Sequence, residues 1–269
     1  MDSTIVYALL LTLFAGLATG LGSLVAFFTS RTNTKFLSFA LGFSAGVMIY
    51  ISLVEIFIDA KESLTASLGE TKGYLFTLIG FFGGMLVIAL IDRLIPKNEN
   101  PHEVKRVEAM QHEPTMAEFT KLKKMGLFTA LAIAIHNFPE GIATFMSAIE
   151  DPQLGIAIAI AVAIHNIPEG IAVAVPIYYA TGDRKKAFKL SFLSGLSEPI
   201  GAFVAYLVLM PYMTDTMFGM VFAGVAGIMV FISLDELLPA AREYDETHTS
   251  IYGVVIGMMV MAISLVLLA

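Results

Sequence analysis

The chain contains no cysteine, and only 14% of its 269 residues are charged. Soluble domains carry about 25% charged residues. The low charge, 57% hydrophobic residues and a mean hydropathy of +0.79 therefore indicate an integral membrane protein. Without cysteine there are no disulfides or thiolate ligands, so a metal would have to be bound by nitrogen and oxygen. The net charge of −7 and the lack of a basic stripe argue against nucleic acid as a partner.

Eight apolar runs approach or exceed the roughly 20 residues that a helix needs to cross a bilayer. They predict an all-α integral membrane protein with eight transmembrane helices, forming a single transmembrane domain over residues 1–269. The expected helices span residues 5–28, 36–58, 74–95, 125–149, 154–179, 187–210, 217–241 and 250–269.

The positive charges are distributed unevenly among the connections between these runs. Fourteen of the 16 Lys and Arg residues lie in odd-numbered connections, and only Lys61 and Lys72 lie elsewhere. Because basic residues concentrate on the cytoplasmic side, this pattern places both termini outside the cell, in a multi-pass protein of the cell membrane. The longest connection, residues 96–124, is then a cytoplasmic loop; its His102 and His112 are candidates for capturing metal.

One hexapeptide pattern occurs twice, near the middle of the fourth and fifth runs. The copies read H-N-F-P-E-G from His136 and H-N-I-P-E-G from His165. Glu140 and Glu169 are the only carboxylates within their runs, and a carboxylate at mid-membrane costs about 2.5–3.5 kcal/mol on insertion scales. Two such residues in matching positions require a compensating partner, for which a cation is the obvious candidate.

Helical geometry indicates how each copy would hold a cation. At 100° per residue, Glu140 lies about 40° from His136 and about 60° from Asn137, so its carboxylate can serve two adjacent sites. The same geometry applies to His165, Asn166 and Glu169. The proline in each copy cannot donate to the carbonyl four residues earlier, so a kink and a free carbonyl are expected there.

A second internal repeat flanks the central pair of helices. Residues 45–55, AGVMIYISLVE, match residues 226–236, AGIMVFISLDE, and the first run resembles the sixth around its glycines. Helices one to three therefore correspond to helices six to eight, in opposite senses through the bilayer, which gives an inverted 3+2+3 repeat around the central metal-binding pair. Inverted repeats with a site at mid-depth are a common transporter architecture. In this alignment Glu198 corresponds to the uncharged Thr19.

The paired H-N-x-P-E-G segments resemble the fourth and fifth helices of the ZIP family of divalent metal transporters, nearest its bacterial ZupT branch. The resemblance covers essentially the whole chain except the loop at 96–124. It implies eight helices, a binuclear metal centre, uptake of metal into the cytoplasm and a further ligand at Glu198. A homodimer is a candidate assembly.

Two metal positions are expected from these residues. The first comprises His136, Glu140, His165 and Glu169, a set of two nitrogen and two oxygen donors suited to tetrahedral Zn²⁺. The second comprises Asn137, Glu140, Asn166, Glu169 and Glu198, which suits Fe²⁺ or Mn²⁺ better. The transported ions are expected to be Zn²⁺, with Fe²⁺, Mn²⁺, Co²⁺ and Cd²⁺ as further candidates, and no catalytic cofactor is expected.

Two other functions are compatible with a buried His–Glu cluster. An intramembrane metal-dependent hydrolase would need an open metal position and a general base, but the chain has no H-E-x-x-H pattern. A metal sensor that does not conduct ions would use the same ligands. The sequence favours the transporter and predicts that the protein is not an enzyme.

Overall fold

The computed structural model describes residues 2–28, 34–94, 116–243 and 248–268, and these residues form helices joined by short turns. The elements follow in chain order: α1 (Ser3–Phe28), α2 (Thr34–Ile51), the π-helical η1 (Ser52–Ile56), α3 (Phe57–Leu68), α4 (Glu70–Leu94), α5 (Met116–Glu150), α6 (Pro152–Thr181), α7 (Arg184–Gly195), α8 (Ser197–Val204), the π-helical η4 (Ala205–Leu209), the 3₁₀ turn η5 (Met210–Tyr212), α9 (Asp215–Ile232), the π-helical η6 (Ser233–Leu237), α10 (Leu238–Glu243) and α11 (Thr249–Leu268).

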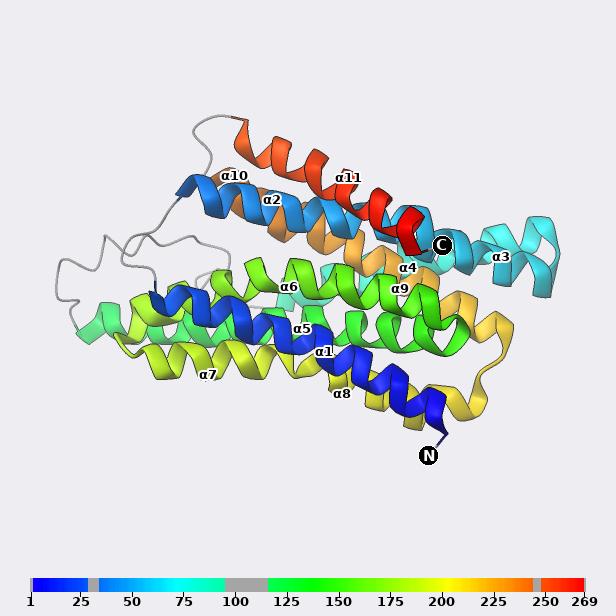
Figure 1. Cartoon of the computed structure of the whole chain (residues 1–269), viewed down its shortest axis with the longest axis horizontal. Coiled ribbons are helices and arrows are strands. Elements are labelled where there is room, and N and C mark those ends of the chain that lie inside the picture. Colours follow the sequence, from blue (N-terminus) through cyan, green and yellow to red (C-terminus); the bar gives the residue numbers. More distant parts are fainter. Residues whose placement is uncertain (1, 29–33, 95–115, 244–247, 269) are drawn as a thin grey trace.

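Several of these elements join into longer rods that cross the molecule. Within the described ranges, seven helical segments are long and apolar enough to span a membrane, and the 35-residue α5 runs beside them as the eighth long helix. The start of α1 and the end of α11 lie toward the same side of the molecule, as an even number of passes requires (Figure 1). The predicted all-helical membrane fold with eight crossings is confirmed.

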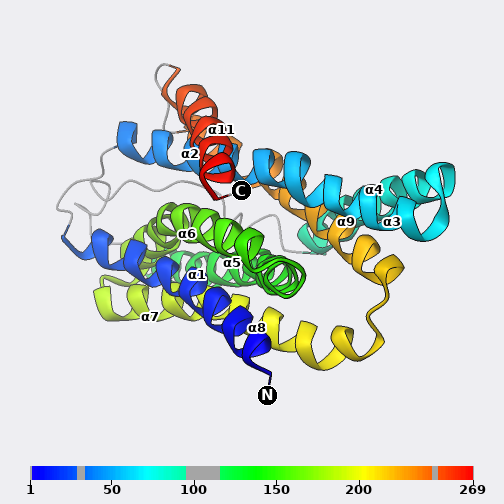
Figure 2. The same ribbon diagram turned by 45° about the vertical axis from the view of Figure 1, so that its right-hand side comes forward.

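The helices form two groups, which Figures 1 and 2 show from two directions. The first group contains α1, α5, α6, α7 and α8; the second contains α2, α3, α4, α9 and α11. Within them, α1 packs on α6 as α8 packs on α5, and α2 packs on α11 as α9 packs on α4. The inverted repeat predicts these pairings. Exchanging the first three crossings with the last three, and α5 with α6, turns the α1–α6 pair into the α8–α5 pair and the α2–α11 pair into the α9–α4 pair.

Glycines make the repeated contacts possible. A side chain at Gly22 of α1 would overlap the carbonyl oxygen of Ile167 in α6, and one at Gly201 of α8 would overlap that of Phe138 in α5. Gly22 and Gly201 are repeat counterparts, and their partners occupy the same position in the two copies of the hexapeptide pattern. The repeat therefore fixes how closely the outer helices approach the central pair.

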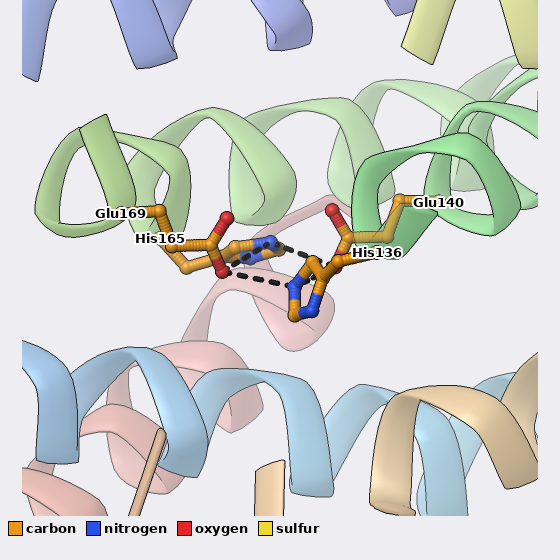
Figure 3. A group of neighbouring side chains, drawn as sticks. All are labelled: His136, Glu140, His165 and Glu169. Atoms are coloured by element: carbon orange, nitrogen blue, oxygen red, sulfur yellow. Dashed lines mark hydrogen bonds and ion pairs between the residues drawn. The ribbon is translucent and has the colours of Figure 1, made fainter. Parts of the chain in front are cut away.

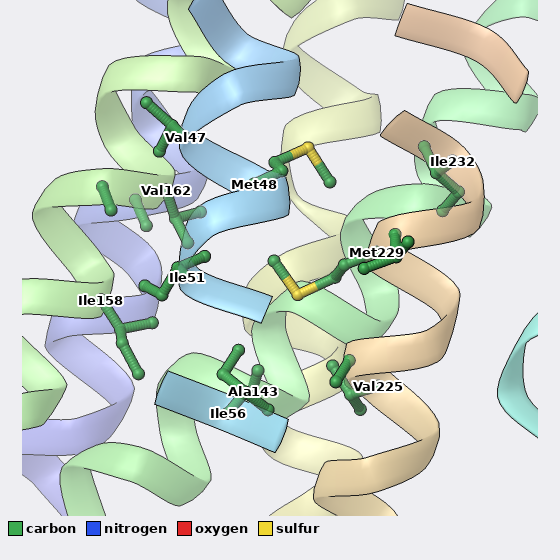
Figure 4. Packing of buried hydrophobic residues seen from close by; sticks show 14 of the residues in the cluster. Val47, Met48, Ile51, Ile56, Ala143, Ile158, Val162, Val225, Met229 and Ile232 are labelled. Carbon is green, nitrogen blue, oxygen red and sulfur yellow. The ribbon is translucent and has the colours of Figure 1, made fainter. Parts of the chain in front are cut away.

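The two groups meet along an apolar layer. Met48 of α2 and Met229 of α9 are fully buried there, together with Ala143 of α5 and Ile158 of α6 (Figure 4). Tight packing over this layer excludes water from the centre of the molecule, which is where α5 and α6 carry their polar residues. The second group thus covers the face of the central pair that α1 and α8 leave free.

Several boundaries differ from those expected. The second crossing continues beyond Ile58 to Leu68, because α3 is amphipathic and hydropathy alone cannot detect a helix that leaves the apolar layer. The sixth crossing is interrupted at Leu196, between α7 and α8. Pro199 lies just after this break and cannot donate to the carbonyl of Gly195. By contrast, α5 and α6 continue as α-helices through Pro139 and Pro168.

The π-helical segments were not expected from the sequence. η1 at Ser52–Ile56 and η6 at Ser233–Leu237 fall at corresponding positions of the second repeat. Glu55 and Glu236 are the matching carboxylates of these two segments. Single-turn π-bulges occur frequently at functional sites, and their repetition here supports the inverted relation between the two halves.

Candidate metal centre

The predicted ligands of the first position come together between α5 and α6. One donor atom from each of His136, Glu140, His165 and Glu169 lies within 4.8 Å of every other. All four side chains are 2% exposed or less. Figure 3 shows both imidazoles and both carboxylates directed at a common point from the two helices.

Nitrogen and oxygen alternate around this cluster. The Nε2 atom of His136 lies 3.3 Å from Oε1 of Glu140 and 3.1 Å from Oε1 of Glu169. The Nε2 atom of His165 lies 3.1 Å and 4.0 Å from the same two oxygens. In a tetrahedral Zn²⁺ site, bonds of 2.0–2.1 Å place neighbouring ligand atoms about 3.3 Å apart. Three of the four N–O distances match this spacing, and the fourth, 4.0 Å between His165 and Glu169, would have to shorten around a tetrahedral Zn²⁺ ion.

The two helices contribute equally because their registers match. His136 and Glu140 are four residues apart on one face of α5, and His165 and Glu169 occupy the same positions on α6. Each imidazole also reaches the carboxylate of the other helix. Sequence spacing predicts the pairing within a helix, but not the pairing between helices, which depends on how α5 and α6 pack.

The residues predicted for the second position are buried next to this cluster. Asn137, Asn166 and Glu198 are completely inaccessible to solvent. The Asn166 side-chain nitrogen donates to Oε1 of Glu198 and, at 2.9 Å, to the backbone carbonyl of Ala15. Glu198 on α8 is thereby linked to α6, as expected for residues that share a site.

Several polar atoms of these residues have no hydrogen-bond partner among the described residues. They are Nδ2 and Oδ1 of Asn137, Oδ1 of Asn166, and Oε2 of Glu140, Glu169 and Glu198. An unpaired buried polar group costs about 1–3 kcal/mol. Six such atoms on neighbouring residues would be strongly destabilising unless a ligand satisfies them, and five of the six are oxygens that can coordinate a cation.

The carboxylates of the second repeat lie outside this group of four. Glu55 is partly exposed in η1, within the crossing that continues to Leu68, and Asp235 is exposed in η6. His102 and His112 lie outside the described residues. The carbonyl of Ala15 was missed because backbone acceptors leave no trace in residue type, although its place in the repeat, one turn before Thr19, could have drawn attention to it.

Comparison with known proteins supports these observations. The family model described as ZIP zinc transporter matches residues 94–265. The chain is 74% identical to the zinc transporter ZupT of Lysinibacillus sphaericus and 71% identical to that of Oceanobacillus iheyensis, in each case over the full length of both chains. It is 58% identical to the zinc transporter ZupT of Streptococcus mutans over 99% of both chains.

Proposed function

The chain belongs to the ZIP family of zinc transporters, and we propose that it takes up Zn²⁺ and related divalent ions through two adjacent metal positions at mid-membrane. The buried cluster of His136, Glu140, His165 and Glu169 carries this proposal. A site of two imidazoles and two carboxylates, placed halfway along two membrane-spanning helices, is suited to a cation in transit. A cation bound at this site would compensate the charge of the two carboxylates, which accounts for their presence in the apolar layer.

The carboxylates of Glu140 and Glu169 would serve both positions. Each directs Oε1 at the histidines and leaves Oε2 without a hydrogen-bond partner among the described residues. The free Oε2 atoms, with Asn137, Asn166 and Glu198, offer oxygen donors to a second ion. Oxygen-rich sets favour Fe²⁺ and Mn²⁺ relative to a histidine-containing set, so the second position would widen the range of transported ions to include them.

Entry into the cell requires no additional energy source. An inside-negative membrane potential favours inward movement by about 2.3 kcal/mol per elementary charge per 100 mV, hence about 4.6 kcal/mol for a divalent ion. We assign the ends of the helices that carry both termini to the outside, since the basic residues concentrate in the opposite connections. All of residues 1–269 would form one transport domain.

A homodimer would use the helices that are least covered within one chain. Only 28% of the most apolar part of α4 and 22% of that of α11 are buried, the two lowest values among the seven spans. These faces meet lipid or a second copy of the chain. Mass measurement of the protein in lipid nanodiscs distinguishes the two arrangements, and a single chain per disc would contradict the dimer.

The proposal is tested by uptake of radioactive Zn²⁺ into proteoliposomes that contain only this protein. We expect saturable uptake by the unaltered chain and by Glu70→Gln, which changes an exposed carboxylate at the start of α4. Glu169→Gln, which changes a buried one, should abolish uptake. Zn²⁺ binding without uptake would favour a sensor, and metal-dependent cleavage of a peptide substrate would favour a hydrolase.

A further inference from the structure

The hydroxyl of Thr19 is buried in α1 and has no hydrogen-bond partner among the described residues. This is unusual within the helix that carries it. Thr12 donates to the carbonyl of Ala8 at 2.9 Å, and Ser23 donates to the carbonyl of Thr19 at 3.0 Å. Each of these two hydroxyls bonds to the carbonyl four residues earlier, a common arrangement for Ser and Thr in helices. Thr19 does not.

The carbonyl that Thr19 would use is occupied by a residue of the metal centre. Four residues before Thr19 is Ala15, whose carbonyl accepts the Asn166 side-chain amide at 2.9 Å. The same amide donates to Glu198. Because residues four apart share one face of a helix, Thr19 lies on the face of α1 that contacts Asn166.

Two further contacts join Thr19 to the chain segments that carry Glu169 and Glu198. Its Oγ1 would lie 2.9 Å from a Cβ atom built on Gly195, which is one turn before Glu198. Its carbonyl oxygen lies against Gly170, the residue that follows Glu169. Thr19 is therefore packed between the backbone segments that present two of the expected ligands, Glu169 and Glu198.

In the inverted repeat, Thr19 is the counterpart of Glu198, whose contacts with the central helix pair are described above. The carbonyl of Glu198 lies against Gly141, just as that of Thr19 lies against Gly170. The two residues thus flank the central helix pair from opposite sides. Across the pair, Glu198 accepts from Asn166, whereas Asn137, the counterpart of Asn166, has neither amide atom paired among the described residues.

We propose that Thr19 supplies a neutral oxygen donor to the second metal position, as the uncharged counterpart of Glu198. This inference rests on the proposed binuclear site and adds a metal ligand from α1, the helix whose Ala15 carbonyl accepts the Asn166 amide. With Thr19 included, four of the five helices of the first group (α1, α5, α6 and α8) would contribute to the second position. A neutral donor adds to the coordination of the ion without adding negative charge.

The inference is tested by binding titrations of Zn²⁺ and Mn²⁺ to the purified full chain, with bound metal counted by mass spectrometry. Thr19→Val keeps the shape of the side chain and removes the oxygen. We expect the second ion to bind roughly tenfold more weakly, on the scale of one lost polar interaction, while the first ion is unaffected. Thr19→Ser should restore the second ion.

The matched control is Thr12→Val, which removes an equally buried hydroxyl of α1 that bonds to the Ala8 carbonyl of its own helix. It should bind both ions as the unaltered chain does. Unchanged binding by Thr19→Val, an equal loss in Thr12→Val, or no restoration by Thr19→Ser would each overturn the inference. If the unaltered chain bound a single ion, the binuclear proposal itself would fail, so the two failures are distinguishable.

Discussion

Removing one central carboxylate should empty both metal positions, whereas removing a residue of one position should leave the other filled. The Oε1 atom of Glu140 lies 3.3 Å and 3.1 Å from the two histidine nitrogens. Its Oε2 atom has no partner among the described residues and is available to the second ion. Glu140→Gln keeps the shape of the side chain but removes its charge from both positions.

The size of the effect follows from the burial of the site. Removing one partner of a buried charge pair costs about 3–5 kcal/mol. At about 1.4 kcal/mol per tenfold, this corresponds to a loss of roughly two to three and a half orders of magnitude in affinity for each ion. Glu140 is 1% exposed, so water cannot replace the missing charge. At a metal concentration that just saturates the unaltered chain, both positions of Glu140→Gln should therefore be largely empty.

The comparison variants each affect one position. His136→Ala removes a nitrogen from the first position alone, and should reduce Zn²⁺ uptake more than Mn²⁺ or Fe²⁺ uptake. Asn137→Leu should retain one Zn²⁺ and lose the second ion. The assay is metal stoichiometry combined with competitive uptake. Two ions retained by Glu140→Gln, or equal loss of all ions in His136→Ala, would refute the model of shared carboxylates.

Three further predictions use other features of the chain. With no native cysteine, Ser67→Cys should react with an impermeant reagent applied to intact cells and Lys185→Cys should not; the reverse result would invert the topology. Metal affinity should fall from about pH 7 towards pH 5, because protons compete for the imidazoles and a free histidine titrates near 6.5; a flat titration would exclude them as ligands. Gly22→Ala should lower the melting temperature through a steric cost of about 1–3 kcal/mol, because a Cβ atom there meets the carbonyl of Ile167. Gly83→Ala is the control and should leave the melting temperature unchanged, because a Cβ atom there meets nothing within 4 Å. Equal melting temperatures for the two variants would refute the packing argument.

Much of the fold can be predicted from the sequence, because a membrane protein has few ways to arrange long apolar runs. Length and hydropathy predict the crossings, and the repeat predicts which helices pair. The π-segments at Ser52 and Ser233 could not be predicted, since they add one residue to a turn without changing residue type. The extension through α3 was missed because it is amphipathic and so carries no hydropathy signal.

The candidate site likewise has features that the sequence predicts and features that depend on tertiary packing. Spacing within one helix predicts that His136 and Glu140 share a face, which depends only on helical periodicity. The contact between His136 and Glu169 depends on the register of α5 against α6, which is set by tertiary packing. The involvement of Ala15 is least predictable, because its contribution is a backbone carbonyl.

The repeat also indicates why the second position would be asymmetric. Two divalent ions bring four positive charges, and Glu140, Glu169 and Glu198 provide three negative ones. A carboxylate in place of Thr19 would balance the charges and hold both ions firmly in a buried site, where electrostatic attraction is strong. A hydroxyl leaves one positive charge uncompensated, so less negative charge offsets the repulsion between the two ions and the second is bound less tightly. For a protein that must release what it binds, the loss of symmetry at this single pair of positions therefore favours transport over storage.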